Sequence, residues 1–254
     1  MNNSLRGRDY INIHDLSSED FRYLIDLAWN LKAQKKSGVD QRYFPGKNVL
    51  ANFEWGSTRT RCAFETSCND LGMGFTYLTN SHMGDCETVK DAMRVFNGMY
   101  DLIVYRAQKD EQFLYDVADL VDIPVINALT LGDHPTQMLA DALTMEEQWG
   151  GLRTSRGKKM AFVGNCAGAP VWYGRLCAML DMDFLADALR HQMCKEMIEE
   201  VEACYAKYAP NRTFTITSDL DALDGVDVIV TEEWRYINPE CGEEVLDPDD
   251  YNSW

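Results

Sequence analysis

Hydrophobic and polar positions along the chain follow two different spacings, and these spacings predict the elements of the fold. Short apolar runs are typical of buried strands, and they occur at 48–53, 74–78, 102–105, 124–127, 160–163, 213–217 and 226–231. Apolar residues three or four positions apart predict helices, and this spacing occurs at 17–37, 62–72, 88–99, 111–120, 136–149, 171–180 and 190–208. Ser17 is a capping residue for the first helix, and Gly38 ends it.

Strands and helices that alternate in this way predict parallel sheets with helices on both faces. We therefore expect an α/β protein of two doubly wound units with parallel sheets, joined by a long interdomain helix. The expected domains are 1–135 and 151–254, with 136–150 as the connecting helix. Residues 241–254 contain five acidic residues, no basic residue and little periodicity, so we expect a solvated tail there.

Composition narrows the functions that such a fold can serve. The formal net charge of the 254 residues is −17, which argues against nucleic acids and anionic membranes as partners because both require a basic face. No apolar run is long enough to span a membrane, and the first residues lack the apolar core of a signal peptide. The eight cysteines form no C-x-x-C pair, so we expect reduced thiols in the cytoplasm and no metal site.

The turn between the first predicted strand and the second predicted helix is a candidate anion site. Ser57, Thr58 and Thr60 supply hydroxyl groups there, and Arg59 and Arg61 supply guanidinium groups. The N–H groups at the start of a helix lack internal partners and lie at the positive end of the dipole, so they favour a bound phosphate. The alternative is an ordinary helix cap that happens to be basic. Cations at a helix N-terminus oppose the dipole, however, which favours a bound anion.

Two further basic side chains follow predicted strands. Arg106 comes directly after the strand at 102–105, and His134 precedes the long helix. Ligands of open α/β sheets bind at the carboxyl ends of strands, so we expect both side chains to converge with the 57–61 turn on one anion. Taken singly, Arg106 could instead pair with Asp101 or Asp110, and His134 could be a cap or a satisfied loop residue.

Four segments, in this order along the chain, resemble the aspartate/ornithine carbamoyltransferases and most closely the ornithine branch. They are 5–17, with Leu-Arg-Gly-Arg-Asp-Tyr and Asp-Leu-Ser; 53–61, with Phe-Glu-x-x-Ser-Thr-Arg-Thr-Arg; 101–106; and 134–141, with His-Pro-Thr-Gln-x-Leu-Ala-Asp. The second segment resembles the carbamoyl-phosphate signature of the family, and the third resembles the strand that delivers a second arginine. The resemblance covers residues 5 to about 150 and implies a homotrimer.

The resemblance implies which residues bind carbamoyl phosphate. Ser57, Thr58, Arg59 and Thr60 would bind its phosphate group, and Thr60 would also reach its carbonyl oxygen. This assignment agrees with the hydroxyl and guanidinium donors of the turn.

The resemblance also implies which residues are catalytic. Arg106, His134 and Thr60 would stabilise the negative charge that grows on the carbonyl oxygen when a neutral amine attacks the carbonyl carbon and phosphate leaves. Gln137 would hold the carbamoyl amide. No metal or other cofactor is expected.

The chain departs from the family pattern in the residues that would meet the acceptor and the neighbouring subunit. In the family, a loop with Ser-Gln…Lys-Glu-Ser reaches into a neighbouring site; here His82 replaces the glutamine and Cys86 the lysine. His82 can still donate a hydrogen bond from the neighbouring subunit, or the loop is a plain surface loop. Asn165 could bind the acceptor or only form its turn. Glu232 could meet the ammonium group of the acceptor.

Two functions of different classes remain open at this point. The first is a carbamoyltransferase that transfers the carbamoyl group of carbamoyl phosphate to an amine, with ornithine as the default acceptor. The second is a non-catalytic carbamoyl-phosphate-binding or assembly protein that retains the fold, which the divergent and shortened second domain favours. A Rossmann-type nucleotide binder is a weaker third possibility because residues 164–170 lack the glycine fingerprint.

Overall fold

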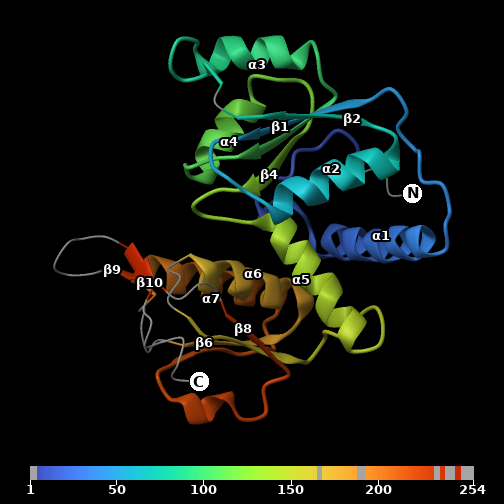
Figure 1. The fold of residues 1–254 in the computed structure, drawn as a ribbon. Helices are drawn as coiled ribbons and strands as arrows, with labels where there is room; N and C mark the ends of the chain where they lie inside the picture. Colours follow the sequence, from blue (N-terminus) through green and yellow to red (C-terminus); the bar gives the residue numbers. More distant parts are fainter. Residues whose placement is uncertain are drawn as a thin grey trace. The chain divides into compact units, whose positions relative to one another are not determined.

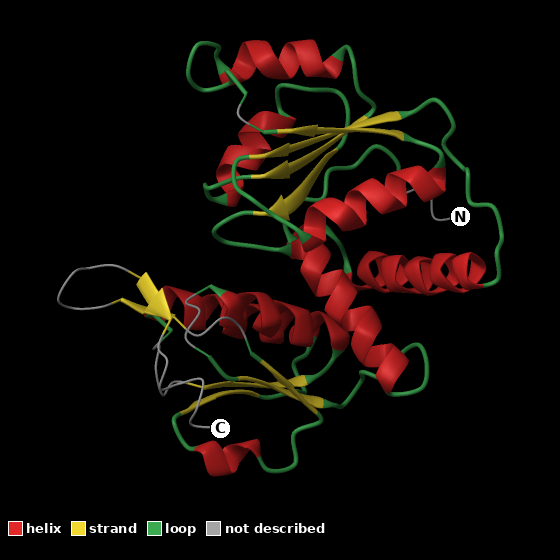
Figure 2. Cartoon of the chain, in the orientation of Figure 1, coloured by secondary structure: helices red, strands yellow, loops and turns green. Residues whose placement is uncertain are grey.

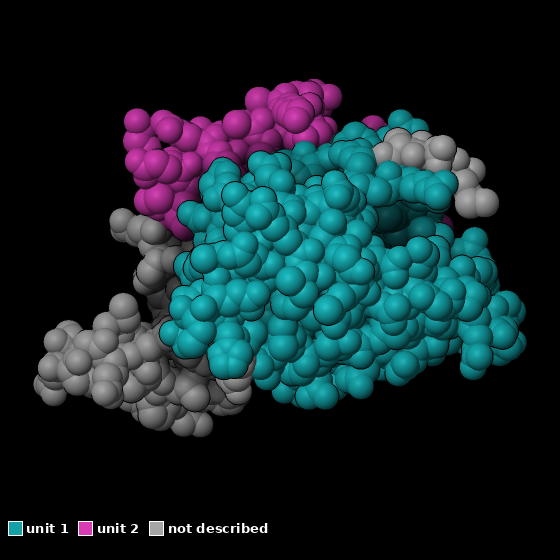
Figure 3. Space-filling model, turned by 90° about the horizontal axis from the view of Figure 1, so that it is seen from above, with its two compact units in different colours: residues 1–143 teal, residues 144–254 magenta. Residues whose placement is uncertain are grey.

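The computed structural model describes residues 5–79, 81–164, 168–187, 193–231, 235–237 and 244–246. The chain divides into two compact units, Met1–Leu143 and Thr144–Trp254, which Figure 3 draws in different colours. Within the described ranges, no helix combines the length and the apolar character that a membrane span requires.

The first unit contains a parallel four-stranded sheet in the order β2-β1-β3-β4. Its strands are β1 (Asn48–Phe53), β2 (Gly74–Leu78), β3 (Leu102–Arg106) and β4 (Val125–Leu129). The helices along the same part of the chain are η2 (Ile13–Asp15), α1 (Ser18–Lys36), α2 (Arg59–Leu71), α3 (Val89–Asn97), α4 (Glu111–Ala118) and α5 (Pro135–Gln148). The boundary between the two units falls inside α5.

Apolar side chains on the two faces of this sheet are covered by different helices. On one face, Leu50 and Ile103 pack in a buried cluster with Met93 of α3 and Leu114 of α4. On the other face, the cluster of Val49, Ala51, Phe53, Cys68, Val104 and Ala128 includes a residue of α2. The strands therefore form a middle layer between helices, as the ribbon in Figure 1 and the coloured cartoon in Figure 2 show.

Local sequence determines where the first helices begin and end. The Ser17 hydroxyl accepts a hydrogen bond from the Asp20 N–H at 3.0 Å and caps α1, as the sequence predicts. Helix α2 ends at Gly72, whose φ of 79° lies in the left-handed region that glycine adopts without strain.

The second unit contains another parallel sheet, in the order β7-β6-β5-β8. Its strands are β5 (Lys159–Phe162), β6 (Asp183–Asp187), β7 (Phe214–Thr217) and β8 (Val228–Val230). Its helices are α6 (Ala169–Leu180), α7 (Lys195–Tyr208) and the short η3 (Leu220–Leu223). All twelve residues of α6 are buried, and Phe184 of β6 stacks on Phe214 of β7 at 5.9 Å between ring centroids.

The predicted α/β class with two parallel sheets is confirmed, and two details of the second unit differ from the sequence analysis. Strand β6 was not predicted, because acidic residues frame an apolar run of only three residues, 184–186. The sequence analysis assigned no element to the expected solvated tail, 241–254, where β10 (Glu244–Leu246) pairs antiparallel with β9 (Arg235–Ile237). Backbone hydrogen bonds between neighbouring strands can form such a short strand even where the sequence shows no hydrophobic periodicity.

Candidate functional site

The carboxyl ends of three neighbouring strands place the candidate residues at one edge of the first sheet. Strand β3 lies between β1 and β4, and all three are parallel. Phe53 is in register with Arg106, and Arg106 with Leu129. The segments that follow β1, β3 and β4 therefore start at adjacent positions, which is where ligands bind in open α/β sheets.

The first turn of α2 lacks the cap that an ordinary helix would have. Thr58 occupies the N-cap position with φ −84° and ψ −60°, and its side chain makes no capping hydrogen bond. The first turn also contains no acidic residue. Free N–H groups at the positive end of the helix dipole thus remain available for an anion, and the alternative of a plain cap loses support.

The other polar side chains of this turn are also uncommitted. Within the described part of the chain, the hydroxyl groups of Ser57 and Thr60 and the guanidinium of Arg59 have no hydrogen-bond or ion-pair partner. By contrast, the Nη2 of Arg61 lies 3.7 Å from Glu65 Oε2, and its Cζ lies 4.6 Å from the ring centroid of Tyr77. Arg59 is therefore the arginine of this turn that is free to bind a phosphate.

Arg106 ends β3 with a half-buried guanidinium. Its Nη1 donates to the Ala128 carbonyl at 3.4 Å, and its Cζ lies 5.3 Å from the ring centroid of Trp55. Its Nε is buried and has no partner among the described residues. Burial lowers the pKa of Arg106 from its usual value, although the side chain stays charged. A buried donor without a partner destabilises the folded state by about 1–3 kcal/mol, so this group favours a bound acceptor.

The two acids that could have paired with Arg106 bind elsewhere. Asp101 accepts from Lys47 Nζ at 2.6 Å, and Asp110 caps α4 through the Phe113 N–H at 3.3 Å. In the described ranges Arg106 forms no ion pair, so the interpretation of this arginine as a surface ion-pair residue is not supported.

Glu54 fixes the end of β1 against the end of β3. Its N–H donates to the Arg106 carbonyl at 3.0 Å. Its carboxylate accepts from the Tyr105 hydroxyl at 2.9 Å and from the Gln108 N–H at 2.8 Å. These bonds hold the backbone on both sides of Arg106 and leave its guanidinium without an ion-pair partner among the described residues.

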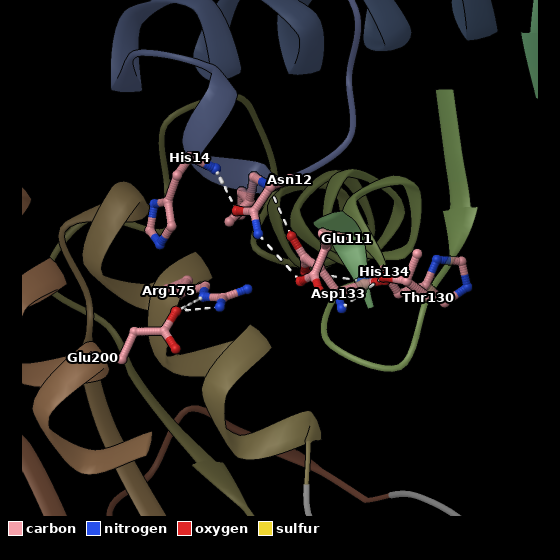
Figure 4. A network of polar contacts seen from close by, with 9 residues as sticks. Asn12, His14, Glu111, Thr130, Asp133, His134, Arg175 and Glu200 are labelled. Carbon is pink, nitrogen blue, oxygen red and sulfur yellow. Dashed lines mark hydrogen bonds and ion pairs between the residues drawn. The ribbon is translucent and has the colours of Figure 1, made fainter. Parts of the chain in front are cut away.

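His134 lies directly before α5 and close to Arg106. Its backbone N–H donates to Asp133 Oδ1 at 2.9 Å, a contact that Figure 4 shows, and its Nδ1 lies 3.3 Å from Thr136 Oγ1. Burial, followed by the positive charge of Arg106, lowers the pKa of His134 to about 4. The imidazole is therefore neutral at pH 7 and can carry only one ring proton.

The remaining predicted residues are less closely assembled. Gln137 is exposed, and its Nε2 donates to Asp141 Oδ1 at 2.9 Å. His82 is exposed in a tight turn, where its carbonyl accepts from the N–H groups of Asp85 and Glu87 at 3.1 and 3.0 Å. Asn165 and Glu232 lie outside the described residues.

Two contacts of the site were not anticipated from the sequence. Trp55 stacks beside Arg106, and Thr136 lies within hydrogen-bond distance of the His134 ring. Trp55 and Arg106 are far apart in the sequence and meet only because β1 and β3 are neighbouring strands. Thr136 lies two positions after His134, so this pair was close in the sequence, but the hydrogen-bond distance is evident only from the structure.

A comparison with known families decides where the chain belongs. Residues 8–147 match the family described as "Aspartate/ornithine carbamoyltransferase, carbamoyl-P binding domain". The chain belongs to the aspartate/ornithine carbamoyltransferase family. The matched range includes the turn at 57–61 and the strand ends that carry Arg106 and His134.

Curated relatives extend the similarity into the second unit. The chain is 37% identical to "Ornithine carbamoyltransferase, catabolic" of Treponema denticola over 235 residues, which cover 91% of this chain and 68% of the relative. It is 38% identical to the protein of the same name from Clostridium perfringens over 240 residues, which cover 91% and 69%. These matches confirm the resemblance and, at the level of the family, the interpretation as a carbamoyltransferase.

Solved structures show the same fold. Ornithine carbamoyltransferase from Pyrococcus furiosus superposes with a TM-score of 0.80 at 28% identity, covering 91% of this chain and 73% of that one. A mitochondrial ornithine carbamoyltransferase from Coccidioides immitis gives a TM-score of 0.82 at 26% identity, covering 90% and 75%. Both confirm the predicted α/β class.

Proposed function

We propose that this protein transfers the carbamoyl group of carbamoyl phosphate to the side-chain amine of ornithine. In this reaction the neutral amine attacks the carbonyl carbon, a C–N bond forms, the bond between the carbonyl carbon and the phosphate oxygen breaks, and the proton that the amine loses is taken up by the departing phosphate. The names of the relatives support ornithine as the acceptor. The uncapped start of α2 follows β1, which is the neighbour of β3 in the sheet, and this placement is the observation that carries the proposal.

The phosphate group binds, in this proposal, to the first turn of α2. Ser57, Thr58 and Thr60 donate from their hydroxyl groups, and the free guanidinium of Arg59 supplies a charge-assisted pair of donors. The lack of a capping side chain and of competing acidic groups in this turn supports the assignment. A net charge of −17 repels a dianion at long range, so the affinity must come from these local donors.

The carbonyl group lies next to Arg106 and His134. When the Nδ1 of His134 accepts a hydrogen bond from the Thr136 hydroxyl, the proton of the neutral imidazole is on Nε2, where it can be donated to the carbonyl oxygen. Arg106 and Thr60 are the other donors to this oxygen. Preorganised donors stabilise the charge that develops there during attack, and losing one costs about 3–4 kcal/mol of transition-state stabilisation.

Gln137 holds the carbamoyl amide in this proposal. Its Nε2 already donates to Asp141 at 2.9 Å, so its amide oxygen remains oriented as an acceptor. The NH₂ group of a carbamoyl moiety supplies the matching donors. Asn165 and Glu232 are proposed to bind the amino acid acceptor.

The assembly is proposed to be a cytoplasmic homotrimer in which the loop around His82 completes the site of a neighbouring subunit. The exposure of His82 supports this role, because its side chain has no partner among the described residues of its own chain. The proposal includes no metal and no further cofactor.

A turnover assay tests the proposed function. The protein is incubated with fresh carbamoyl phosphate and ornithine, lysine, putrescine or aspartate, and both phosphate release and the ureido product are measured. We expect equal amounts of the two products with ornithine. If no amine gives a ureido product while carbamoyl phosphate still raises the melting temperature, the chain is a non-catalytic binder and the enzymatic proposal is wrong.

A further inference from the structure

A fully buried polar cluster extends from β4 into the loop that leads to α5. It consists of Asn127, Thr130 and Asp133, with 0%, 1% and 0% of their surface exposed. None of these three residues is among those proposed to bind carbamoyl phosphate. Burying polar groups is unfavourable unless each finds a partner, so their contacts should indicate what the cluster does.

Asn127 joins three backbone segments through its amide. Its Nδ2 lies within hydrogen-bond distance of the Ile11 carbonyl at 2.8 Å, Thr130 Oγ1 at 3.2 Å and the Asp133 carbonyl at 3.3 Å. Its Oδ1 accepts from the Leu129 N–H at 2.8 Å. Both ends of the amide are therefore bonded to the loop that leads to His134.

Thr130 and Asp133 close this loop into a compact turn. The Thr130 N–H donates to the Asp133 carbonyl at 3.0 Å, and the Asp133 N–H donates to Thr130 Oγ1 at 3.2 Å. The Asp133 carboxylate accepts from the His134 N–H at 2.9 Å and from the Ile13 N–H at 2.8 Å. Figure 4 shows Thr130, Asp133 and His134 together in this arrangement.

The last residue of β4, directly before this loop, is strained. Leu129 has φ 151°, a conformation that residues with side chains rarely adopt and that typically costs about 1–3 kcal/mol. The register between β3 and β4 shifts at Tyr105 and Arg106, next to this residue. Leu129 is held at its N–H by Asn127 and at its carbonyl by the Ala107 N–H, at 3.0 Å.

The backbone conformation at Leu129 is linked to the Arg106 side chain through the residue that precedes it. The residue before Leu129 is Ala128, whose carbonyl accepts from Arg106 Nη1 at 3.4 Å. Asn127 therefore controls the backbone next to the acceptor of Arg106, and Asp133 holds the backbone N–H of His134. Arg106 and His134 are therefore both linked to this cluster, although neither residue is part of it.

We propose that Asn127, Thr130 and Asp133 are positioning residues that hold the Ala128 carbonyl and the His134 backbone in the arrangement that carbamoyl transfer requires. This inference rests on the proposed function. Donors that act on a transition state must be placed to within a fraction of an ångström, and misplacement by about 1 Å can lower the rate of an enzyme by 10²-fold. The cluster acts on the rate of the chemical step and leaves the phosphate contacts of α2 intact.

Removal of the Thr130 hydroxyl tests this inference. Thr130→Val retains the branched shape but loses the group that bonds Asn127 and Asp133, whereas Thr130→Ser retains the hydroxyl. We expect Thr130→Val to lower kcat by roughly 10–100-fold with the KM for carbamoyl phosphate within about threefold of wild type, and Thr130→Ser to restore kcat to within about threefold. Partial unfolding would also lower the apparent kcat at an unchanged KM, so the rates are compared per folded protein, at a temperature where the melting curves show each variant to be folded.

Ser17→Ala is the matched control. It also removes a hydroxyl that accepts a backbone N–H, at the start of α1, and should lower the melting temperature without lowering kcat at 25 °C. If Thr130→Val does not fold, Asp133→Asn replaces it: this variant keeps the shape but can accept only one of the two N–H groups, and a similar loss of kcat is expected.

The outcomes separate this inference from the proposed function. If the wild-type protein has no carbamoyltransferase activity, the proposed function fails. If the wild type is active and the folded Thr130→Val or Asp133→Asn variant has wild-type kcat, the positioning role is wrong. An equal loss of kcat in Thr130→Ser would also contradict it, because that variant retains the hydroxyl.

Discussion

At the scale of single residues, the site is defined by basic side chains that remain without acidic partners. In a protein this acidic, an arginine is expected to have a carboxylate partner. Arg156 and Arg212, for example, both place their Nε close to a carboxylate oxygen of Asp181, at 2.7 and 3.0 Å. In the described part of the chain, Arg59 and Arg106 have no such partner. Guanidinium groups without acidic partners, one at the start of α2 and one at the end of β3, are expected where an anion completes the structure.

The lowered pKa of His134 predicts how the stability of the ligand-free protein depends on pH. The pKa is about 4 in the folded state and about 6.5 in an unfolded chain. Below pH 6.5 the unfolded state binds a proton that the folded state does not, so the free energy of unfolding falls as the pH is lowered toward 4. We expect the wild type to lose up to about 1.4 kcal/mol per pH unit more than His134→Gln in this window.

Urea unfolding between pH 7 and pH 4.5, in a buffer without phosphate, measures this difference. Phosphate is omitted because a bound dianion would raise the pKa of His134. Identical pH dependence in the two proteins would mean that His134 is not buried beside Arg106 in its neutral form.

At the scale of elements, the first turn of α2 differs from that of α3. Thr88 caps α3 by accepting from the Asp91 N–H at 3.1 Å, whereas Thr58 at the same position of α2 makes no such bond. Thr88→Ala should therefore lower the free energy of unfolding by about 1 kcal/mol. Thr58→Ala should change it by less than about 0.5 kcal/mol and weaken the binding of carbamoyl phosphate instead. Chemical denaturation of both variants checks this prediction, which is wrong if they lose equal stability.

The ends of the same two helices provide a second matched pair. Gly72 follows α2 in the left-handed region at φ 79°, where an added Cβ would lie 3.3 Å from the Cβ of Arg42. Gly98 follows α3 at φ −83°, which any residue can adopt. We expect Gly72→Ala to lower the free energy of unfolding by about 1 kcal/mol, and Gly98→Ala to leave it unchanged or raise it slightly. Equal melting temperatures of the two variants would contradict the assigned conformation of Gly72.

The elements also show which features could be predicted from the sequence. The turn at 57–61 was predicted because its hydroxyl and guanidinium groups are contiguous and follow an apolar strand. The role of Asn127 was not, because one of its partners, Ile11, lies 116 positions earlier and a polar residue at the end of a strand does not reveal its partner. Strand β6 was missed because its apolar run is too short to establish a period.

At the scale of the whole molecule, the proposed homotrimer makes a specific prediction about shared sites. If His82 of one subunit completes the site that contains Arg106 of another, His82→Ala and Arg106→Ala should each reduce activity strongly. Mixed trimers made by co-expression of the two variants should then recover activity, because about one quarter of the sites in a random mixture combine an intact Arg106 with an intact His82. Mixtures that stay as inactive as their parents would show that the His82 loop does not act on a neighbouring subunit.

We expect the segments that follow β1, β3 and β4 to bind one molecule of carbamoyl phosphate together, in a protein whose net charge is −17. Calorimetric titration of fresh carbamoyl phosphate into the wild type, Arg59→Ala and the control Arg156→Ala, an exposed arginine of the second unit, tests this expectation most directly. We expect saturable heat with the wild type, the same Kd with Arg156→Ala, and a Kd weaker by roughly 10–100-fold with Arg59→Ala, because a charged hydrogen bond contributes about 1.5–3 kcal/mol. No binding heat with the wild type, or the same Kd for all three proteins, would contradict the account.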